Sequence, residues 1–193
     1  INASALANVS TADIQALSSD QVKALTNAQL GALSTAQITA LGNDVAELST
    51  SQITALKSNQ VGALTTAQLA SLSTTQLQAL TATQVTGFTT AQMGSLTTDK
   101  IQALTTAQFG SLSATQLNAM AADMATIETA DIAAINAKAT AGLSTTSIQN
   151  LSTDQVVALT KGQLQALSST QLNAMETADL IKLTTQQMTG FRA

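Results

Sequence analysis

A repeated eight-residue pattern is clearest in residues 64–95, which read LTTAQLAS, LSTTQLQA, LTATQVTG and FTTAQMGS in succession. Counted from the first residue, the chain divides into 24 such units and the remainder Phe191–Ala193; two units, 41–47 and 120–126, have only seven residues. The first position is apolar in all 24 units, the second is Ser or Thr in 17, and the fifth is Gln in 15. The consensus is L-[ST]-[ST]-x-Q-[ILVM]-x-[AG]. We therefore expect residues 1–193 to form a single continuous repeat array.

The spacing of the apolar positions indicates a helix that restarts in every unit. In one uninterrupted helix, eight residues turn through about 800°, so the Leu stripe would rotate around the whole helix. In a β-strand, the first and sixth positions have opposite parity and would point to opposite faces of the sheet. The alternative is a β-solenoid, which the many Thr residues and the even repeat length favour, but frequent Ala, Leu and Gln oppose it.

Each consensus unit also contains the sequence signature of a helix start. In residues 33–40, Ser34 and Gln37 have the S/T-x-x-Q spacing of a capping box, and Leu33 and Ile38 occupy the two positions of a hydrophobic staple. The sequence predicts an all-α solenoid of one- to two-turn helices, one per unit, with Leu and Ile inside and Thr, Ser and Gln outside. The seven-residue units lack the Ser/Thr cap, and we expect local changes in pitch or kinks there.

Composition excludes several classes of function. The chain has no His, Cys or Pro, 2% aromatic residues, 7 Lys+Arg and a net charge of -4. Catalysis by imidazole or thiolate is thereby excluded, as are zinc, haem and iron–sulfur sites, so we expect no metal and no cofactor. The few cations and the missing aromatic platforms argue against nucleic-acid binding. Ser, Thr or Gln interrupts every apolar run, so no membrane span is expected.

The remaining candidates for nucleophilic catalysis are Ser or Thr beside Lys. Thr160 precedes Lys161, and Ser58 follows Lys57. A nucleophile of this kind needs Lys as its base when no His is present. We interpret these residues as exposed capping and loop residues, and we expect no catalytic residues and no enzymatic activity.

Acidic residues gather at Asp123, Glu128 and Asp131, and again at Glu176 and Asp179. Calcium would need six to eight oxygens that converge on one point. We interpret the two E-T-A-D sequences as units in which Glu and Asp replace Ser/Thr and Gln in the capping scheme, because negative charge is favourable at a helix N-terminus.

Two further sets of residues recur at regular positions. The five Met residues occupy apolar or neighbouring positions and are expected to fill the core; they are Met93, Met120, Met124, Met175 and Met188. Pairs of Thr recur at 65–66, 89–90 and 97–98. They are either solvated caps or a surface that faces ice or a glycan.

Two segments of the chain resemble each other over more than one eight-residue unit. Residues 1–11, INASALANVST, match residues 135–145, INAKATAGLST, at several positions. Either a larger block of units was duplicated, or two low-complexity segments agree by chance.

The two ends of the chain contain no polar capping unit. The chain begins at Ile1 with a unit of interior type, and Phe191–Ala193 opens a new unit. Isolated solenoids need polar terminal repeats. We expect either a window of a longer array or head-to-tail stacking of copies, which would build a fibre.

The repeat units also resemble a known kind of array. The segments LSTDQVVALT (151–160) and LTTAQLASLSTTQLQAL (64–80) are similar to the Ser/Thr/Gln-rich octapeptide arrays of very long secreted or surface proteins of proteobacteria, which include adhesins. The resemblance implies an extracellular or cell-surface location. We expect a structural repeat protein, either a self-stacking filament subunit or a rod-like surface stalk. The alternative is an adhesin that presents ranks of Thr and Gln to a glycan, ice or another surface.

Overall fold

The computed structural model describes residues 2–189, so the remainder Phe191–Ala193 lies outside the described residues. Residues 2–189 form 22 short α-helices and two 3-10 helices, one per repeat unit, and contain no strand. The all-α prediction is confirmed, and the β-solenoid alternative is wrong.

The chain forms two compact units, residues 1–96 and 97–193, which are described separately. The helices of the first unit are α1 (Ala3–Ala7), α2 (Thr11–Gln15), α3 (Ser19–Lys23), α4 (Asn27–Ala32), α5 (Thr35–Ala40), η1 (Gly42–Glu47), α6 (Thr50–Thr54), α7 (Ser58–Gly62), α8 (Thr66–Ser71), α9 (Thr74–Ala79), α10 (Ala82–Val85) and α11 (Thr90–Met93). The helices of the second unit are α12 (Thr98–Ala103), α13 (Thr106–Ser111), α14 (Ala114–Ala119), η2 (Ala121–Thr126), α15 (Thr129–Ala134), α16 (Ala137–Ala141), α17 (Thr145–Gln149), α18 (Thr153–Ala158), α19 (Lys161–Ala166), α20 (Ser169–Ala174), α21 (Thr177–Leu180) and α22 (Thr185–Met188). A single continuous array stays a prediction.

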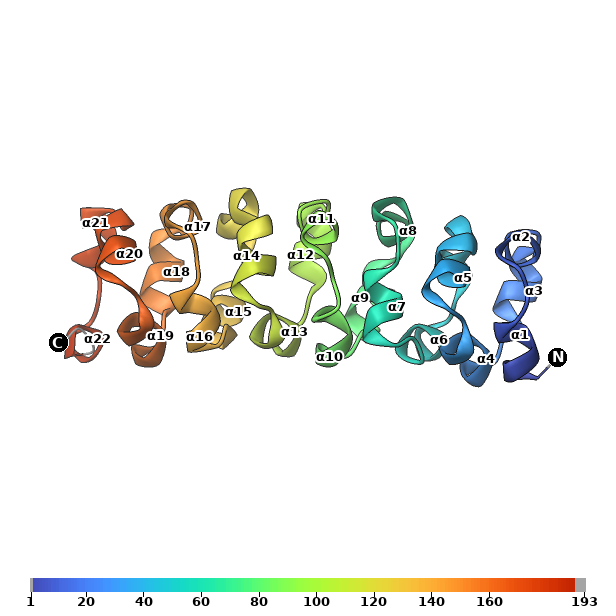
Figure 1. Ribbon diagram of the computed structural model, residues 1–193. Coiled ribbons are helices and arrows are strands. Elements are labelled where there is room, and N and C mark those ends of the chain that lie inside the picture. The colour runs from blue at the N-terminus through green and yellow to red at the C-terminus, as the bar shows by residue number, and fades with distance from the viewer. Residues whose placement is uncertain (1, 190–193) are drawn as a thin grey trace. The chain divides into compact units, whose positions relative to one another are not determined.

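In each of the two compact units, three successive helices make one turn of the solenoid, which we call a coil. In the first unit α1 packs on α4, α2 on α5 and α3 on η1, and the same three-helix step continues to α8 on α11 (Figure 1). In the second unit α13 packs on α15, α15 on α18 and α18 on α21. A coil therefore contains three repeat units, and the same side of the solenoid recurs after three units.

The first and sixth positions of the units form the interior. Leu33 is 3% exposed and Ile38 is 0% exposed, as the hydrophobic staple predicts. Leu72 is likewise buried, whereas Thr74 is exposed. Burial of two such side chains per repeat unit is worth about 3–6 kcal/mol before the conformational entropy is subtracted. A one-turn helix needs this stabilisation because it is not stable alone.

Two predictions about side-chain burial are wrong. Gln was expected outside, but thirteen of the fifteen fifth-position glutamines are buried. Met188 was expected in the core, but it is 51% exposed because α22 lies in the last coil of its unit and no described coil covers it. The other four Met residues are buried as predicted.

The seven-residue units form the two 3-10 helices. Neither η1 nor η2 has a hydrogen bond from a side-chain cap, in agreement with the missing Ser/Thr. Gly42 opens η1 with a φ of 56°, a left-handed conformation that other residues adopt only with strain. Both helices keep their place in the three-helix step, since η1 packs on α3 and α8, and η2 packs on α12 and α17.

Small residues allow two coils of the first unit to approach closely. A Cβ atom on Gly87 would lie 2.2 Å from the carbonyl oxygen of Ser58, and one on Gly62 would lie 2.3 Å from the carbonyl oxygen of Gly87. No side chain fits in either place. The predicted preference for Ala or Gly at the eighth position is thus explained at Gly87 by backbone contact between α7 and the segment that follows α10.

Candidate functional site

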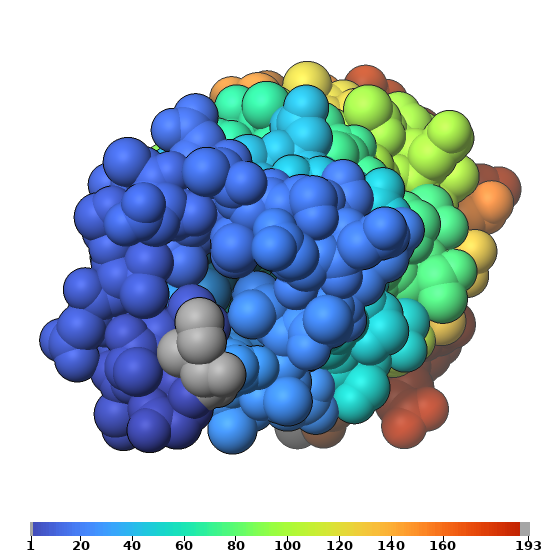
Figure 2. Space-filling model, turned by 90° about the vertical axis from the view of Figure 1, so that its right-hand side faces the viewer, coloured from blue at the N-terminus to red at the C-terminus, as the bar shows by residue number. Residues whose placement is uncertain are grey.

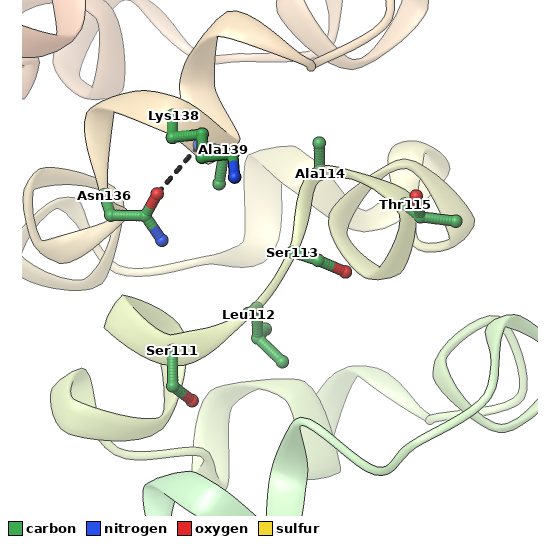
Figure 3. A pocket seen from close by; sticks show the side chains of 8 residues that line it. All are labelled: Ser111, Leu112, Ser113, Ala114, Thr115, Asn136, Lys138 and Ala139. Atoms are coloured by element: carbon green, nitrogen blue, oxygen red, sulfur yellow. Dashed lines mark hydrogen bonds between the residues drawn. The ribbon is translucent and has the colours of Figure 1, made fainter.

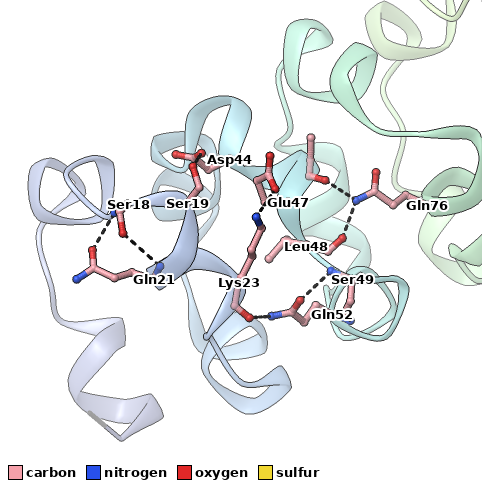
Figure 4. A network of polar contacts seen from close by, with 11 residues as sticks. Ser18, Ser19, Gln21, Lys23, Asp44, Glu47, Leu48, Ser49, Gln52 and Gln76 are labelled. Carbon is pink, nitrogen blue, oxygen red and sulfur yellow. Dashed lines mark hydrogen bonds and ion pairs between the residues drawn. The ribbon is translucent and has the colours of Figure 1, made fainter.

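The buried glutamines cap the helices in which they lie. In α6 the backbone N–H of Ser49 donates to Oε1 of Gln52 at 2.8 Å, and the N–H of Gln52 donates to Oγ of Ser49 at 3.3 Å (Figure 4). Two of the N–H groups that a helix start leaves unpaired are satisfied in this way. The capping box predicted at Ser34 and Gln37 is present at 2.8 and 3.2 Å.

The other end of the same side chain reaches the preceding coil, which the sequence analysis did not anticipate. Nε2 of Gln52 donates to the carbonyl oxygen of Lys23 at 3.0 Å (Figure 4). It also donates to the carbonyl oxygen of Leu25 at 2.7 Å. Lys23 is the last residue of α3 and Leu25 follows the helix, so both carbonyls lie where a helix leaves C=O groups without an intrahelical partner. We call this pair of contacts, one to the own helix start and one to the preceding helix end, the glutamine bridge.

The glutamine bridge recurs in both units. Its acceptors are mostly the carbonyls 28 and 30 or 31 positions earlier, for example Leu48 and Ala46 for Gln76, and Ile135 and Ile132 for Gln163. The glutamines that make both contacts include Gln37, Gln52, Gln60, Gln68, Gln76, Gln84, Gln92, Gln155, Gln163, Gln171 and Gln187.

A neutral carboxamide is suited to this position because it has both an acceptor and donors. Burial of Gln is costly only when its polar atoms lack partners. Within residues 2–189, no buried side-chain nitrogen or oxygen lacks a hydrogen-bond partner. The second contact therefore explains why Gln lies inside.

An ion pair on the surface accompanies one bridge. Nζ of Lys23 lies 2.8 Å from Oε2 of Glu47, between α3 and η1 (Figure 4). The hydrogen bond and the charge of Glu47 raise the pKa of Lys23 above its ordinary value. Because the pair is exposed, it contributes little to stability.

Aspartate replaces Gln in several units and makes a different contact. Oδ1 of Asp44 accepts a hydrogen bond from Ser19 at 2.6 Å, and Oδ1 of Asp179 accepts one from Thr153 at 2.6 Å. In each case the hydroxyl belongs to the preceding coil. A carboxylate has no N–H, so it cannot donate to the carbonyls as Gln does.

Among these aspartates, Asp131 has a pKa that its surroundings shift. Its side chain is buried, and the burial raises the pKa of its carboxyl group; a hydrogen bond from Thr106 lowers the pKa, and the charge of Glu128 raises it. The carboxyl group thus lies in an environment that disfavours its charge.

In the two E-T-A-D units, Glu and Asp occupy the predicted capping positions, but the predicted capping hydrogen bonds of the Glu side chains are absent. Glu128 and Glu176 occupy the N-cap positions of α15 and α21, but neither side chain makes a capping hydrogen bond. Asp131 and Asp179 follow at the third helical position. In the described part of the chain, no three acidic side chains converge on a point where a metal ion would bind.

The Ser/Thr–Lys neighbours take part in capping. Oγ1 of Thr160 accepts from the N–H of Gln163 at 3.3 Å, and Lys161 is exposed. The N–H of Lys57 donates to Oε1 of Gln60 at 2.7 Å, and Ser58 is half-buried against α10.

The Thr pairs are exposed. Thr65 and Thr89 are N-caps that accept from Gln68 and Gln92, and Thr97 is an N-cap position without a side-chain hydrogen bond. A Thr surface for a ligand stays a prediction, but its Gln part is wrong because those side chains are buried.

In the first described coil of the first unit, one fifth-position glutamine makes no hydrogen bond with another described coil. Gln21 is exposed there, its Oε1 accepts from Ser18, and its Nε2 donates to no described residue. Beside it a hollow of about 240 Å³ is lined by half-buried Leu17 and Leu25. Figure 2 shows the first unit from this side, with its N-terminal residues in blue. This face therefore presents the donor half of a glutamine bridge.

The last described coil of the second unit exposes apolar side chains. Leu180 is half-buried, whereas the corresponding sixth-position residues of interior coils are fully buried. Ile181 is 74% exposed, and Met188 lies on the same coil. This end presents apolar side chains that no described coil covers.

Short capped helices in a three-helix coil, joined by glutamine bridges, define a structural repeat protein of the α-solenoid class. The chain belongs to the ALTTAQ repeat family, whose model matches residues 6–43, 42–74, 66–98 and 124–161, more than half of the sequence. No curated protein matches the chain. Between residues 2 and 189, no helix has the length and apolar character needed to cross a membrane.

Proposed function

We propose that the protein is an extracellular structural element that stacks on copies of itself, as a filament subunit or a surface stalk. The proposal rests on the exposed Gln21 amide, which has the same fifth position as the interior glutamines and donates to no described residue. A stacked copy would supply carbonyl acceptors for this amide.

The first and last described coils both expose apolar side chains that a stacked copy would bury. The first coil offers an amide donor beside half-buried Leu17 and Leu25, and the last coil offers apolar Leu180 and Met188. Inside each unit the same kinds of groups meet between neighbouring coils. A head-to-tail contact is heterologous and does not need to close into a ring, so it would extend into a fibre.

The surface and the sequence support a location outside the cell. The exterior is polar with few charged groups, and the chain has 9% charged residues and no Cys. The resemblance to octapeptide arrays of secreted and surface proteins adds to this. Labelling of intact cells with an antibody against the chain tests the location: a surface signal supports it, and a signal only after lysis contradicts it.

Sedimentation velocity and negative-stain microscopy over a range of concentrations test the stacking. We expect open-ended fibres that lengthen with concentration. Leu17→Glu with Leu25→Glu should abolish them, because two charges would enter the contact. The matched control is Thr66→Glu with Thr90→Glu, which adds the same charges to an exposed side, and it should still form fibres. Wild-type protein that stays monomeric at high concentration would contradict the proposal.

A further inference from the structure

Two rows of opposite charge run along one side of the second unit. The helices α15, α18 and α21 stack on one another there, and α16 stacks on α19. Among residues 127–189, the exposed charged side chains alternate between acid and base along the chain and are Glu128, Lys138, Asp154, Lys161, Glu176 and Lys182. None of the six takes part in an ion pair within the described part of the chain. Each of three successive coils therefore exposes one acid and one base.

The acids lie where the stacked helices begin, and the lysines lie beyond the other end of the same helices. Glu128 and Glu176 occupy the N-cap positions of α15 and α21, and Asp154 lies in the first turn of α18; we call these three residues the acidic row.

The lysine row consists of Lys138, Lys161 and Lys182. Lys138 lies in α16 (Figure 3), which follows α15, Lys161 begins α19, which follows α18, and Lys182 follows α21. The length of one short helix separates the two rows. Because the same coils carry both rows, the rows have the same repeat distance.

Two apolar side chains are exposed on this face. Val157, near the end of α18, is 36% exposed although α21 packs on that helix, so its position faces the side of the solenoid. Ile181 has the same seventh position one coil later and is 74% exposed. The face of α15, α18 and α21 therefore combines uncovered apolar side chains with complementary charges at its two edges.

We propose that this face binds the same face of a second copy of the chain, in a parallel dimer with a twofold axis along the solenoid. A half-turn about that axis brings the acidic row of each copy against the lysine row of the other and keeps every coil beside its equivalent. An antiparallel twofold dimer places acid against acid and lysine against lysine, which like-charge repulsion disfavours. In the parallel dimer Ile181 lies against Thr177 and Ala178 of the second copy, two positions that are exposed in one chain.

The contact lies on the side of the coils, so it is independent of the head-to-tail stacking proposed above. It is also confined to the second unit, since the corresponding helices α2, α5, α7 and α10 and their N-caps contain only Asp13 and Lys57 as charged residues. Exposed ion pairs are weak one by one and are screened by salt. The dimer should therefore form at high protein concentration and dissociate as salt is added.

A dilution series of the full chain followed by NMR tests the contact. The chain contains Leu17→Glu and Leu25→Glu so that stacking does not contribute, and the unaltered chain is used if that variant does not fold. The amide shifts of Asp154, Val157 and Ile181 should change with concentration. A rise in ionic strength from about 0.01 M to about 1 M shortens the Debye length from about 30 Å to about 3 Å and should raise the dissociation constant at least about tenfold. No concentration dependence at this face, or no response to salt, would overturn the proposal.

Reversal of the rows gives a second test, by sedimentation equilibrium. One variant has only acids in both rows and carries Lys138→Glu, Lys161→Glu and Lys182→Glu. The other has only lysines and carries Glu128→Lys, Asp154→Lys and Glu176→Lys; Lys57 at the N-cap of α7 shows that such a position accepts lysine. Neither variant should associate with itself, but an equimolar mixture should form dimers.

The matched control carries all six changes, which exchanges the rows and keeps the net charge, and it should dimerise as the wild type does. Self-association of either triple variant as strong as that of the wild type, or a mixture that does not pair, contradicts the contact. If a triple variant does not fold, the salt response of the wild type decides the matter.

A single cysteine tests the direction of the two copies, because the chain has no other Cys. Ala178→Cys lies in the last coil of the face, so two copies bring their cysteines into the same coil only when they are parallel. A short bifunctional maleimide should therefore cross-link this variant, and dimers without a cross-link would rule out the parallel arrangement.

Discussion

The stacked helices α18 and α15 differ in the residue that faces the preceding coil. In α18, Oε1 of Gln155 accepts from Ser152 at 2.8 Å, and its Nε2 donates to Met124 at 2.8 Å and Ile127 at 2.6 Å. In α15 the equivalent residue is Asp131, whose buried carboxyl group takes a hydrogen bond from Thr106. No hydrogen bond to the carbonyl of Leu104, the expected acceptor below Asp131, occurs within the described residues.

This difference identifies the fifth position as the place where one coil is joined to the next. Gln makes the contact without a charge, so the contact does not depend on pH. Asp shortens the side chain, introduces an acid and transfers the donor to a hydroxyl of the preceding coil. The free energy of unfolding and its pH dependence should therefore follow the residue in this position.

The largest effect is expected for Gln155→Glu. The change keeps the shape but places a carboxylate against two carbonyl oxygens in a buried site. An unpaired buried charge should lower the free energy of unfolding by about 3 kcal/mol or more at neutral pH. Urea denaturation followed by circular dichroism measures it.

The matched control is Gln149→Glu, the same change at an exposed position of α17. It should alter the free energy of unfolding by less than about 0.5 kcal/mol. Similar losses in the two variants would mean that the glutamine bridge contributes nothing specific.

Asp131→Gln should make α15 resemble α18. The new amide can cap α15 and donate to the carbonyl of Leu104, and the desolvated carboxyl group disappears. Two net hydrogen bonds are worth about 2 kcal/mol, so the variant should be more stable than the wild type by about that amount at neutral pH. A less stable variant, measured by the same denaturation, would show that the contact with Thr106 is better than a bridge.

The acid also predicts a pH dependence. The pKa of Asp131 is raised above its ordinary value of 3.8, so the folded chain binds this proton more tightly than the unfolded chain. The stability that this proton contributes is full below pH 3.8 and is lost as the pH rises through the raised pKa. Relative to Asp131→Asn, the wild type should therefore lose stability as the pH rises above 3.8. A difference that stays constant or grows in the opposite direction contradicts the assignment.

The local elements were predictable from sequence, whereas the contacts between coils were not. Ser34, Gln37, Leu33 and Ile38 determine a helix start through spacing within one unit, and all four lie as predicted. The burial of Gln depends on a second contact about 30 residues away, which requires knowledge that three units complete a coil. Met188 was misjudged for the same reason, because its exposure depends on the coil that would cover it.

The absence of Gln from the fifth position is visible in the sequence at Ala139 and Ser147. The groups that replace Gln could be found only in the structure. The carboxamide of Asn136 caps Ala139 and donates to the carbonyl of Gly110 in the preceding coil. The carboxamide oxygen of Asn118 accepts hydrogen bonds from Ser144 and Ser147.

The smallest effect on the free energy of unfolding is expected for removal of the Thr153 hydroxyl, which donates to Asp179 of α21 where other coils have a glutamine bridge. Thr153→Ala removes the hydrogen bond from Oγ1 to Asp179, and the free energy of unfolding should fall by about 1 kcal/mol, because Asp179 is buried and loses a donor. Thr153→Ser keeps the hydroxyl and should stay near the wild type. Thr74→Ala makes the same change on an exposed side chain and should alter stability by less than about 0.5 kcal/mol. If Thr153→Ala is as neutral as Thr74→Ala, the contact between hydroxyl and carboxylate does not join the coils, and the units with Asp are held by apolar packing alone.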